Sequence, residues 1–141
     1  MMKVSAGNVV AIPVGGTIGL GKILFVSKYF KDVTLLKLLS TRFPSVDAAL
    51  TADLQGPYEL LYTGVGPIRK GCWTIIANEP VSDHERAMSK RTAGGEVWLE
   101  DEHLGPASGA DLASLPRMLV LGSGLVEKRV RCPPGASLEA R

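Results

Sequence analysis

The sequence predicts a mainly β fold: a strongly bent antiparallel sheet or a partly open small barrel, with one or two short helices. Sixteen glycines and nine prolines in 141 residues interrupt most long helices. The apolar runs between them are short and rich in β-branched residues, which favours strands. A chain of this length buries about 68% of its unfolded surface, so it needs neither metal nor disulfides to fold. We expect a single domain over residues 1–131 and a flexible C-terminal tail over residues 132–141.

Three apolar segments near the N-terminus predict consecutive strands. Asn8–Val14 is rich in valine and isoleucine and carries a proline near its end, as at an edge or a strand terminus. The glycines of residues 15–21 then close a hairpin or bend a strand, because the chain enters another apolar run at residues 23–26. Residues 32–39 are ambiguous in period, but their position favours a third strand. Three sequential strands predict a meander.

The middle of the chain predicts a short helix and two more strands. Ser45 is a suitable N-cap for a helix over residues 45–52, because its side chain can accept from a first-turn N–H. Residues 58–62, with tyrosine at both ends, predict a strand. Residues 72–77 predict a buried strand that places Trp73 in the core.

The second half is less apolar at first and then returns to short elements. Residues 78–95 are charged and rich in small side chains, which predicts a long surface loop. Residues 96–101 alternate polar and apolar, as a half-exposed strand does. Residues 111–114 are compatible with one helical turn, and residues 118–121 with a last short strand. The total expected is five to seven strands.

Composition excludes several classes of protein. The formal charge of +2 and a pI near 8.6 are too mild to indicate a nucleic-acid partner. No signal-peptide pattern is evident, and no apolar run approaches the roughly 18 residues of a membrane-spanning helix. Cys72 and Cys132 could form at most one bridge, so reduced thiols are the simpler interpretation. We therefore expect a cytoplasmic protein that binds neither membrane nor nucleic acid.

One segment resembles a phosphate-binding loop. Residues 16–22 satisfy the first seven positions of G-x-x-x-x-G-K. The eighth position requires a hydroxyl for Mg²⁺ but holds Ile23, and a strand rather than a helix is predicted to follow. A hairpin is therefore the favoured interpretation, and no cofactor is expected.

The candidates for catalysis are equally incomplete. His84 and His103 each lie among carboxylates and could bind a divalent metal or act as a general base. Their spacing does not match a metal motif, so two distant loops would have to converge. Ser123 lacks the G-x-S-x-G frame of a strained nucleophile, and Cys72 is expected to be buried and inert. We assign no catalytic, cofactor-binding or metal-binding residue.

Charge is distributed unevenly along the chain. Residues 1–70 carry a net charge of +4 and residues 71–141 a net charge of −2. An acidic patch could meet a basic partner, such as a nuclease, and speed their encounter, although a solvated strand end is the simpler alternative. The candidate partner-binding residues are the acidic side chains Asp83, Glu85, Glu96, Glu100, Asp101 and Glu102.

The first strands also carry a family resemblance. Residues 7–13, GNVVAIP, followed by GKI at residues 21–23, resemble the start of the immunity protein 26 family of bacterial polymorphic toxin systems. That family typically begins with G-D-x-x-A-I-P-L, a short glycine-containing turn and G-[RK]-[VI]. Residues 68–77 look like its connector and Trp-containing strand. Asn8 and Val14 depart from the usual acidic residue and leucine, and the resemblance spans residues 7–131.

The resemblance implies a mainly β protein that neutralises a toxin delivered by a competing cell. The resulting hypothesis is a non-enzymatic immunity protein that binds a cognate toxin domain and covers its active site. Because the family label extends to proteins named as phosphotriesterases, one alternative is a small metal-dependent hydrolase that uses His84 or His103. Another is a non-catalytic assembly domain. The oligomeric state is left open.

Overall fold

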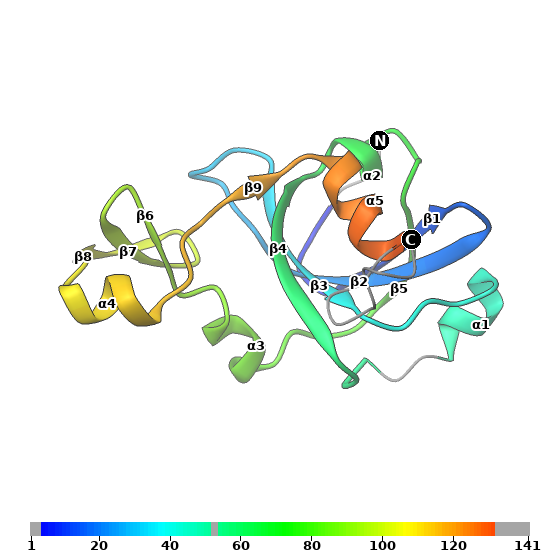
Figure 1. Cartoon of the computed structure of the whole chain (residues 1–141), viewed down its shortest axis with the longest axis horizontal. Helices are drawn as coiled ribbons and strands as arrows, with labels where there is room; N and C mark the ends of the chain where they lie inside the picture. The colour runs from blue at the N-terminus through cyan, green and yellow to red at the C-terminus, as the bar shows by residue number, and fades with distance from the viewer. Residues whose placement is uncertain (1–3, 52–53, 132–141) are drawn as a thin grey trace, which may run out of the picture.

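The described part of the chain, residues 4–51 and 54–131 of a computed structural model, is a mixed α/β structure made mostly of strands (Figure 1). Its nine strands form a six-stranded sheet and a three-stranded sheet. The strands are β1 Asn8–Val14, β2 Thr17–Val26, β3 Val33–Leu39, β4 Tyr58–Gly64, β5 Thr74–Asn78, β6 Arg91–Ala93, β7 Glu96–Leu99, β8 Glu102–Pro106 and β9 Val120–Leu121. The five short helices are α1 Val46–Leu50, α2 Gly66–Arg69, α3 Asp83–Ala87, α4 Gly109–Ser114 and α5 Ser123–Arg131.

The six-stranded sheet has the order β5-β1-β2-β3-β4-β9. β1 to β4 are antiparallel neighbours in chain order, which confirms the predicted meander. β9 runs parallel to β4, with Val120 opposite Tyr62, so the sheet is mixed and not purely antiparallel as expected. The described residues close no barrel, although β4 is visibly bent along its length (Figure 1).

Several expected elements need correction. Residues 78–95 are not one long loop, because they contain α3 and β6. The strand expected within residues 72–77 is β5, an edge strand with mostly exposed or half-buried side chains, and Cys72 before it is exposed rather than buried. Trp73 is buried, as predicted. The described residues hold more than the five to seven strands and one or two helices expected.

Local capping explains why the helices are short but defined. Ser45 accepts from the N–H of Ala48 and begins α1, as predicted, while Ala52 lies outside the described residues. α3 and α4 each begin with a full capping box, in which the N-cap serine and an acidic side chain three residues later bond each other's backbone N–H. These boxes satisfy backbone donors that would otherwise be left unpaired at the helix ends.

The glycine-rich segment, residues 15–21, forms the tight turn after β1 and the first half of β2. Gly15 and Gly16 have φ values of +55° and +85°, which suits the two-residue turn between β1 and β2 because glycine adopts positive φ without strain. Gly19 lies inside β2 against α5: a Cβ there would stand 2.5 and 2.7 Å from the methyl carbons of Val130. The glycine therefore lets the helix approach the sheet closely.

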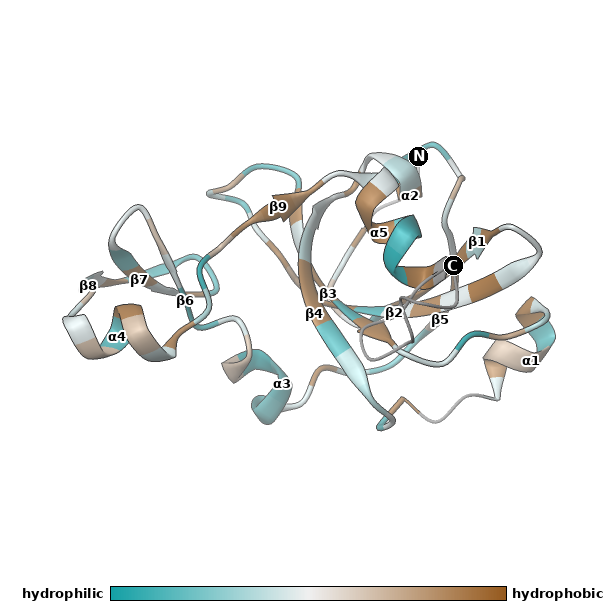
Figure 2. Cartoon of the chain, viewed as in Figure 1, coloured by the Kyte–Doolittle hydropathy of each residue, from teal (hydrophilic) through white to brown (hydrophobic). Residues whose placement is uncertain are grey.

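One face of the six-stranded sheet holds the main core. Val126 and Val130 of α5 pack with Ile12, Ile23 and Leu36 from the three central strands. Trp73 joins the same cluster, and its indole N–H donates to Glu127 of α5 at 3.0 Å. The apolar colouring of the sheet strands contrasts with the hydrophilic α3 in Figure 2. Burial of this face fixes α5 to the sheet.

The opposite face is covered by three smaller groups of side chains. α1 packs Ala49 against Leu20 and Val9 at one end. Lys22 and Lys37, which are cross-strand neighbours, lie buried in the middle beneath α3. A third apolar cluster around Leu24, Phe25, Leu35 and Tyr62 lies at the end nearest the three-stranded sheet. This sheet and α4 project to one side of the molecule (Figure 1).

Candidate functional site

The most distinctive exposed feature is a cluster of aromatic rings where the β2–β3 turn meets the three-stranded sheet. The ring of Tyr29 lies 4.8 Å from that of Trp98 at a tilt of 33°, and Phe30 meets Trp98 edge-on at 5.3 Å. His103 extends the cluster with its ring 5.0 Å from Trp98. Tyr29 is 67% exposed, which is unusual for a large aromatic side chain in contact with two others. We call these four residues the aromatic cluster.

Asp101 fixes the turn that presents Tyr29. Its carboxylate accepts from the Ser27 hydroxyl at 2.6 Å and from the Lys28 backbone N–H at 2.7 Å. Burial opposes the charge on Asp101, but these hydrogen bonds outweigh it and hold the pKa of the carboxyl below its usual range. Ser27 also accepts from the Phe30 N–H at 2.8 Å. The carboxylate therefore ties the three-stranded sheet to the turn.

A buried arginine supports the cluster from below. Arg91 of β6 is fully buried, and its guanidinium lies 5.4 to 5.6 Å from the ring centres of Phe25, Phe30 and Tyr62. Such cation–π contacts favour a desolvated guanidinium. Burial lowers the pKa of Arg91 from its ordinary value and raises the pKa of Tyr62 to about 12, with the neighbouring Arg91 charge opposing the rise at Tyr62.

The hydrogen bonds of Arg91 reach backbone carbonyls of the connecting segments. Its Nη1 donates to the carbonyls of Ser89 at 3.1 Å and Glu100 at 2.5 Å. Nε and Nη2 are buried without a hydrogen-bond partner among the residues the structure describes. Arg91 thus joins the chain before β6 to the turn after β7, directly beneath the aromatic cluster.

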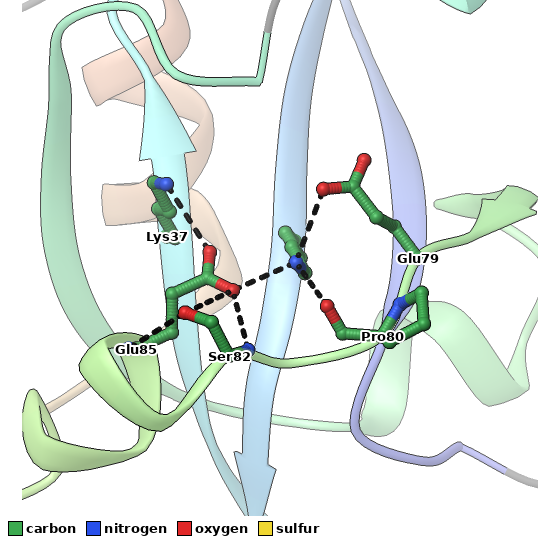
Figure 3. A network of polar contacts seen from close by, with 6 residues as sticks. Lys37, Glu79, Pro80, Ser82 and Glu85 are labelled. Atoms are coloured by element: carbon green, nitrogen blue, oxygen red, sulfur yellow. Dashed lines mark hydrogen bonds and ion pairs between the residues drawn. The ribbon is translucent and has the colours of Figure 1, made fainter.

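A second polar network joins α3, which precedes the three-stranded sheet in the chain, to the six-stranded sheet (Figure 3). Glu85 of α3 pairs with two lysines: its Oε1 lies 2.9 Å from the Nζ of Lys22, and its Oε2 lies 3.2 Å from the Nζ of Lys37. Lys22 also donates to the Pro80 carbonyl at 3.0 Å and lies 3.5 Å from Glu79. Both lysines and Glu85 are at most 7% exposed, so this is a buried ion-pair network.

The charge state of Glu85 is set by competing effects. Burial alone would raise its pKa, but bonds from Lys22, the Ser82 N–H and Lys37 lower the pKa to about 2. Glu85 also completes the capping box of α3 with Ser82. One carboxylate therefore both caps the helix and pairs with two buried lysines, of which Lys22 also lies 3.5 Å from Glu79.

The structure separates the acidic residues that we expected to bind a partner. Glu85 is buried, which corrects its expected place on the surface. Asp101 bonds to the β2–β3 turn, Glu100 pairs with Arg86 at 3.0 Å, and Glu96 pairs with His103 at 3.2 Å. The bond to His103 thereby places the Glu96 carboxylate beside the other rings of the aromatic cluster.

Two of the acidic candidates keep exposed side chains. Glu102 begins β8, one residue before His103, and Asp83 begins α3. Because successive side chains of a strand point to opposite faces, Glu102 lies on the face away from Trp98 and His103, and Asp83 is on a separate element.

The features that suggested chemistry have other roles. The phosphate-loop-like segment runs into β2 instead of a helix, and the Nζ of Lys22 is engaged by Glu85 and Pro80. Ser123 begins α5. Among the residues described, no three His, Cys, Asp or Glu side chains gather in a way that could hold a metal ion. No helix in this part of the chain is long and apolar enough to cross a membrane.

The aromatic cluster was not predicted from the sequence. Tyr29 and Phe30 lie in a turn, and Trp98 lies almost 70 residues later, in a strand whose partner strands were not predicted. The available signal was an adjacent pair of aromatics at a position where turns are normally polar. The chain matches no protein-family model, no curated protein and no solved structure. The likeness to the immunity protein 26 family remains a prediction.

Proposed function

We propose that this chain is a non-enzymatic immunity protein that binds a cognate bacterial toxin domain in the cytoplasm and blocks its active site. The observation that carries the proposal is the aromatic cluster with the carboxylate of Glu96 beside it. Exposed tyrosine and tryptophan are the side chains that most often dominate protein interfaces, because they bury much area at little entropic cost. Tyr29 is exposed and lies against the half-buried Trp98, which together with His103 belongs to the projecting three-stranded sheet.

Charge defines the chemistry of the partner. Glu96 lies beside the aromatic rings, with its carboxylate 3.2 Å from the exposed ring of His103. A basic surface, such as the cleft of a nuclease, would gain electrostatic steering and cation–π contacts at this place. The rigid support from Asp101 and Arg91 keeps the surface in one arrangement before binding, which limits the entropy lost on association.

The test uses the product of the neighbouring reading frame, purified and titrated against this chain. We expect a complex at micromolar concentration or tighter, and survival of cells that express both proteins. Replacing Tyr29 by alanine should weaken the complex about 30-fold, because hot-spot truncations cost about 2 kcal/mol or more. Loss of cell survival should accompany this loss of affinity.

Tyr58→Ala is the matched control, since Tyr58 is also an exposed tyrosine, 41% accessible, but belongs to β4. It should leave the affinity unchanged. For charge, Glu96→Lys should slow association, whereas Asp47→Lys in α1, at the opposite end of the molecule (Figure 1), should not. Equal losses of affinity in Tyr29→Ala and Tyr58→Ala, or the absence of any complex, would contradict the proposal.

A further inference from the structure

A groove lies beside β4, on a part of the molecule separate from the aromatic cluster. Its volume is about 270 Å³, and its lining is mainly apolar. The lining includes side chains of β3, β4, the α3 C-cap and the chain around β9: Leu35, Leu60, Tyr62, Met88, Leu119 and Leu121. Leu119 is 56% exposed, so apolar surface is left open to solvent. The space suits one or two large apolar side chains of a partner.

The same groove follows a strand edge that is only partly paired. β4 spans Tyr58–Gly64, but β9 pairs with it only at Tyr62 and Thr63. Among the described residues, no strand lies against the earlier part of this edge (Figure 1). The open part, residues 58–61 of β4, lies before the start of β9, so an added strand would lie in line with β9 on its N-terminal side.

Hydrogen bonding on the other side of β4 shows which groups face the open edge. The Ser40 N–H donates to the Pro57 carbonyl at 2.9 Å, and the Val65 N–H donates to the Asp32 carbonyl at 3.1 Å. Backbone groups alternate in direction along a strand, so odd-numbered residues of β4 face β3. The N–H and C=O of Leu60 therefore point outward, beside the groove that its side chain lines.

We propose that β4 accepts an extended peptide segment of a partner protein, which adds a strand next to β9 and inserts apolar side chains into the groove. Strand addition supplies main-chain hydrogen bonds, and a pocket for alternate side chains supplies specificity. The backbone N–H and C=O of Leu60 are available for the main-chain hydrogen bonds, and the apolar lining of the groove forms the side-chain pocket. This inference goes beyond the proposed toxin neutralisation and does not depend on it.

The charge at the rim selects an acidic segment. Arg117 and Arg129 both line the groove, and both are substantially exposed. Arg129 lies 3.5 Å from Glu59, whereas Arg117 makes no ion pair with another described residue. A peptide that alternates apolar residues with glutamate would place its carboxylates near these cations while its apolar side chains enter the groove.

The edge also lacks the usual protection against strand addition. Edge strands commonly carry lysine, proline or a bulge to prevent pairing with other chains. β4 reads YELLYTG, with neither proline nor lysine, and its register with β3 is regular from Val33 to Leu39. An edge without lysine, proline or a bulge, next to an apolar groove, is the arrangement expected of a peptide-binding edge.

The experiment titrates the full chain with an eight-residue peptide, acetylated and amidated, in which valine or leucine alternates with threonine or glutamate. We expect saturable binding, with NMR shift changes and slower amide exchange confined to residues 58–62 and to the chain around β9. Arg117→Glu should weaken binding about tenfold. Lys70→Glu makes the same charge change at the C-cap of α2, outside the groove, and should change affinity by less than about twofold.

Two further probes keep the outcome decisive. Leu60→Pro removes the outward N–H without touching the β3 ladder and should abolish binding. Because that variant could also disturb folding, a peptide N-methylated on the amides of its edge-facing residues provides an independent test and should not bind. Equal binding of this peptide, equal binding of a peptide with lysine in place of glutamate, or shift changes at β5 instead of β4 would overturn the proposal. Occupation of the groove by decanoate with no amide protection from the peptide would likewise overturn it.

Discussion

At the scale of single residues, Glu85 shows how much one side chain can decide. It forms ion pairs with two buried lysines and caps α3. These contacts lower its pKa from an ordinary value near 4.5 to about 2. A carboxyl with a depressed folded-state pKa stabilises the protein above the unfolded pKa and loses that effect as pH falls. We expect about 3 kcal/mol of stability to disappear between pH 4.5 and pH 2, as measured by urea unfolding across that range.

Substitution separates this contribution from general acid sensitivity. Glu85→Gln should destabilise the protein by about 3 to 5 kcal/mol at neutral pH, because it leaves Lys22 and Lys37 buried without their carboxylate. Glu79→Gln is the control, since Glu79 is 42% exposed and lies 3.5 Å from Lys22. It should cost no more than about 1 kcal/mol. Similar losses for the two variants would show that the buried network does not stabilise the fold.

At the scale of elements, the contact between α5 and β2 depends on a missing side chain. Gly19→Ala would place a Cβ 2.5 Å from a methyl carbon of Val130, so the helix or the strand must shift. We expect a loss of about 1 to 3 kcal/mol in thermal or chemical unfolding. Adding Val130→Ala should recover part of this loss, because it removes the clashing methyls.

Gly124→Ala provides the matched control for this element. Gly124 lies in α5 itself, and a Cβ there would meet nothing within 4 Å. Alanine favours helix by up to about 1 kcal/mol over glycine, so this variant should be neutral or stabilising. If it destabilised the protein as much as Gly19→Ala, the close approach of α5 to β2 would not be the cause.

At the scale of the whole molecule, the three-stranded sheet is held to the rest through Asp101. Asp101→Ala removes the bonds to Ser27 and the Lys28 N–H, so hydrogen exchange should accelerate at residues 27–30 while the central sheet strands stay protected. Glu102→Ala changes the next residue, which is exposed, and should leave exchange as in the parent protein. Unchanged exchange in Asp101→Ala would mean that the aromatic rings alone fix the turn.

Local patterns determined the elements of the first half of this protein. The β-branched content of Asn8–Val14, the paired glycines of the first turn and the capping serine of α1 are short-range signals, and each corresponds to an element of the structure. The acidic second half was also correctly seen as charged, but the fate of each carboxylate was not predictable. Charge in the sequence does not show whether a side chain meets solvent, a lysine 48 residues away or a backbone N–H.

Tertiary structure alone decided the rest, because the remaining features depend on long-range contacts. Glu85 is buried only because Lys22 and Lys37 become neighbours across two strands, and α5 packs only where Gly19 leaves room. The aromatic cluster joins a turn to a strand formed by residues almost 70 positions later, and the groove exists only where β9 stops short of covering β4. The sequence by itself determined the strands and turns of the first half of the chain, but not β6 and β8, which pair with β7. The surfaces that these strands offer to other molecules were set by packing, since surface, burial and edge are properties of the assembled sheet.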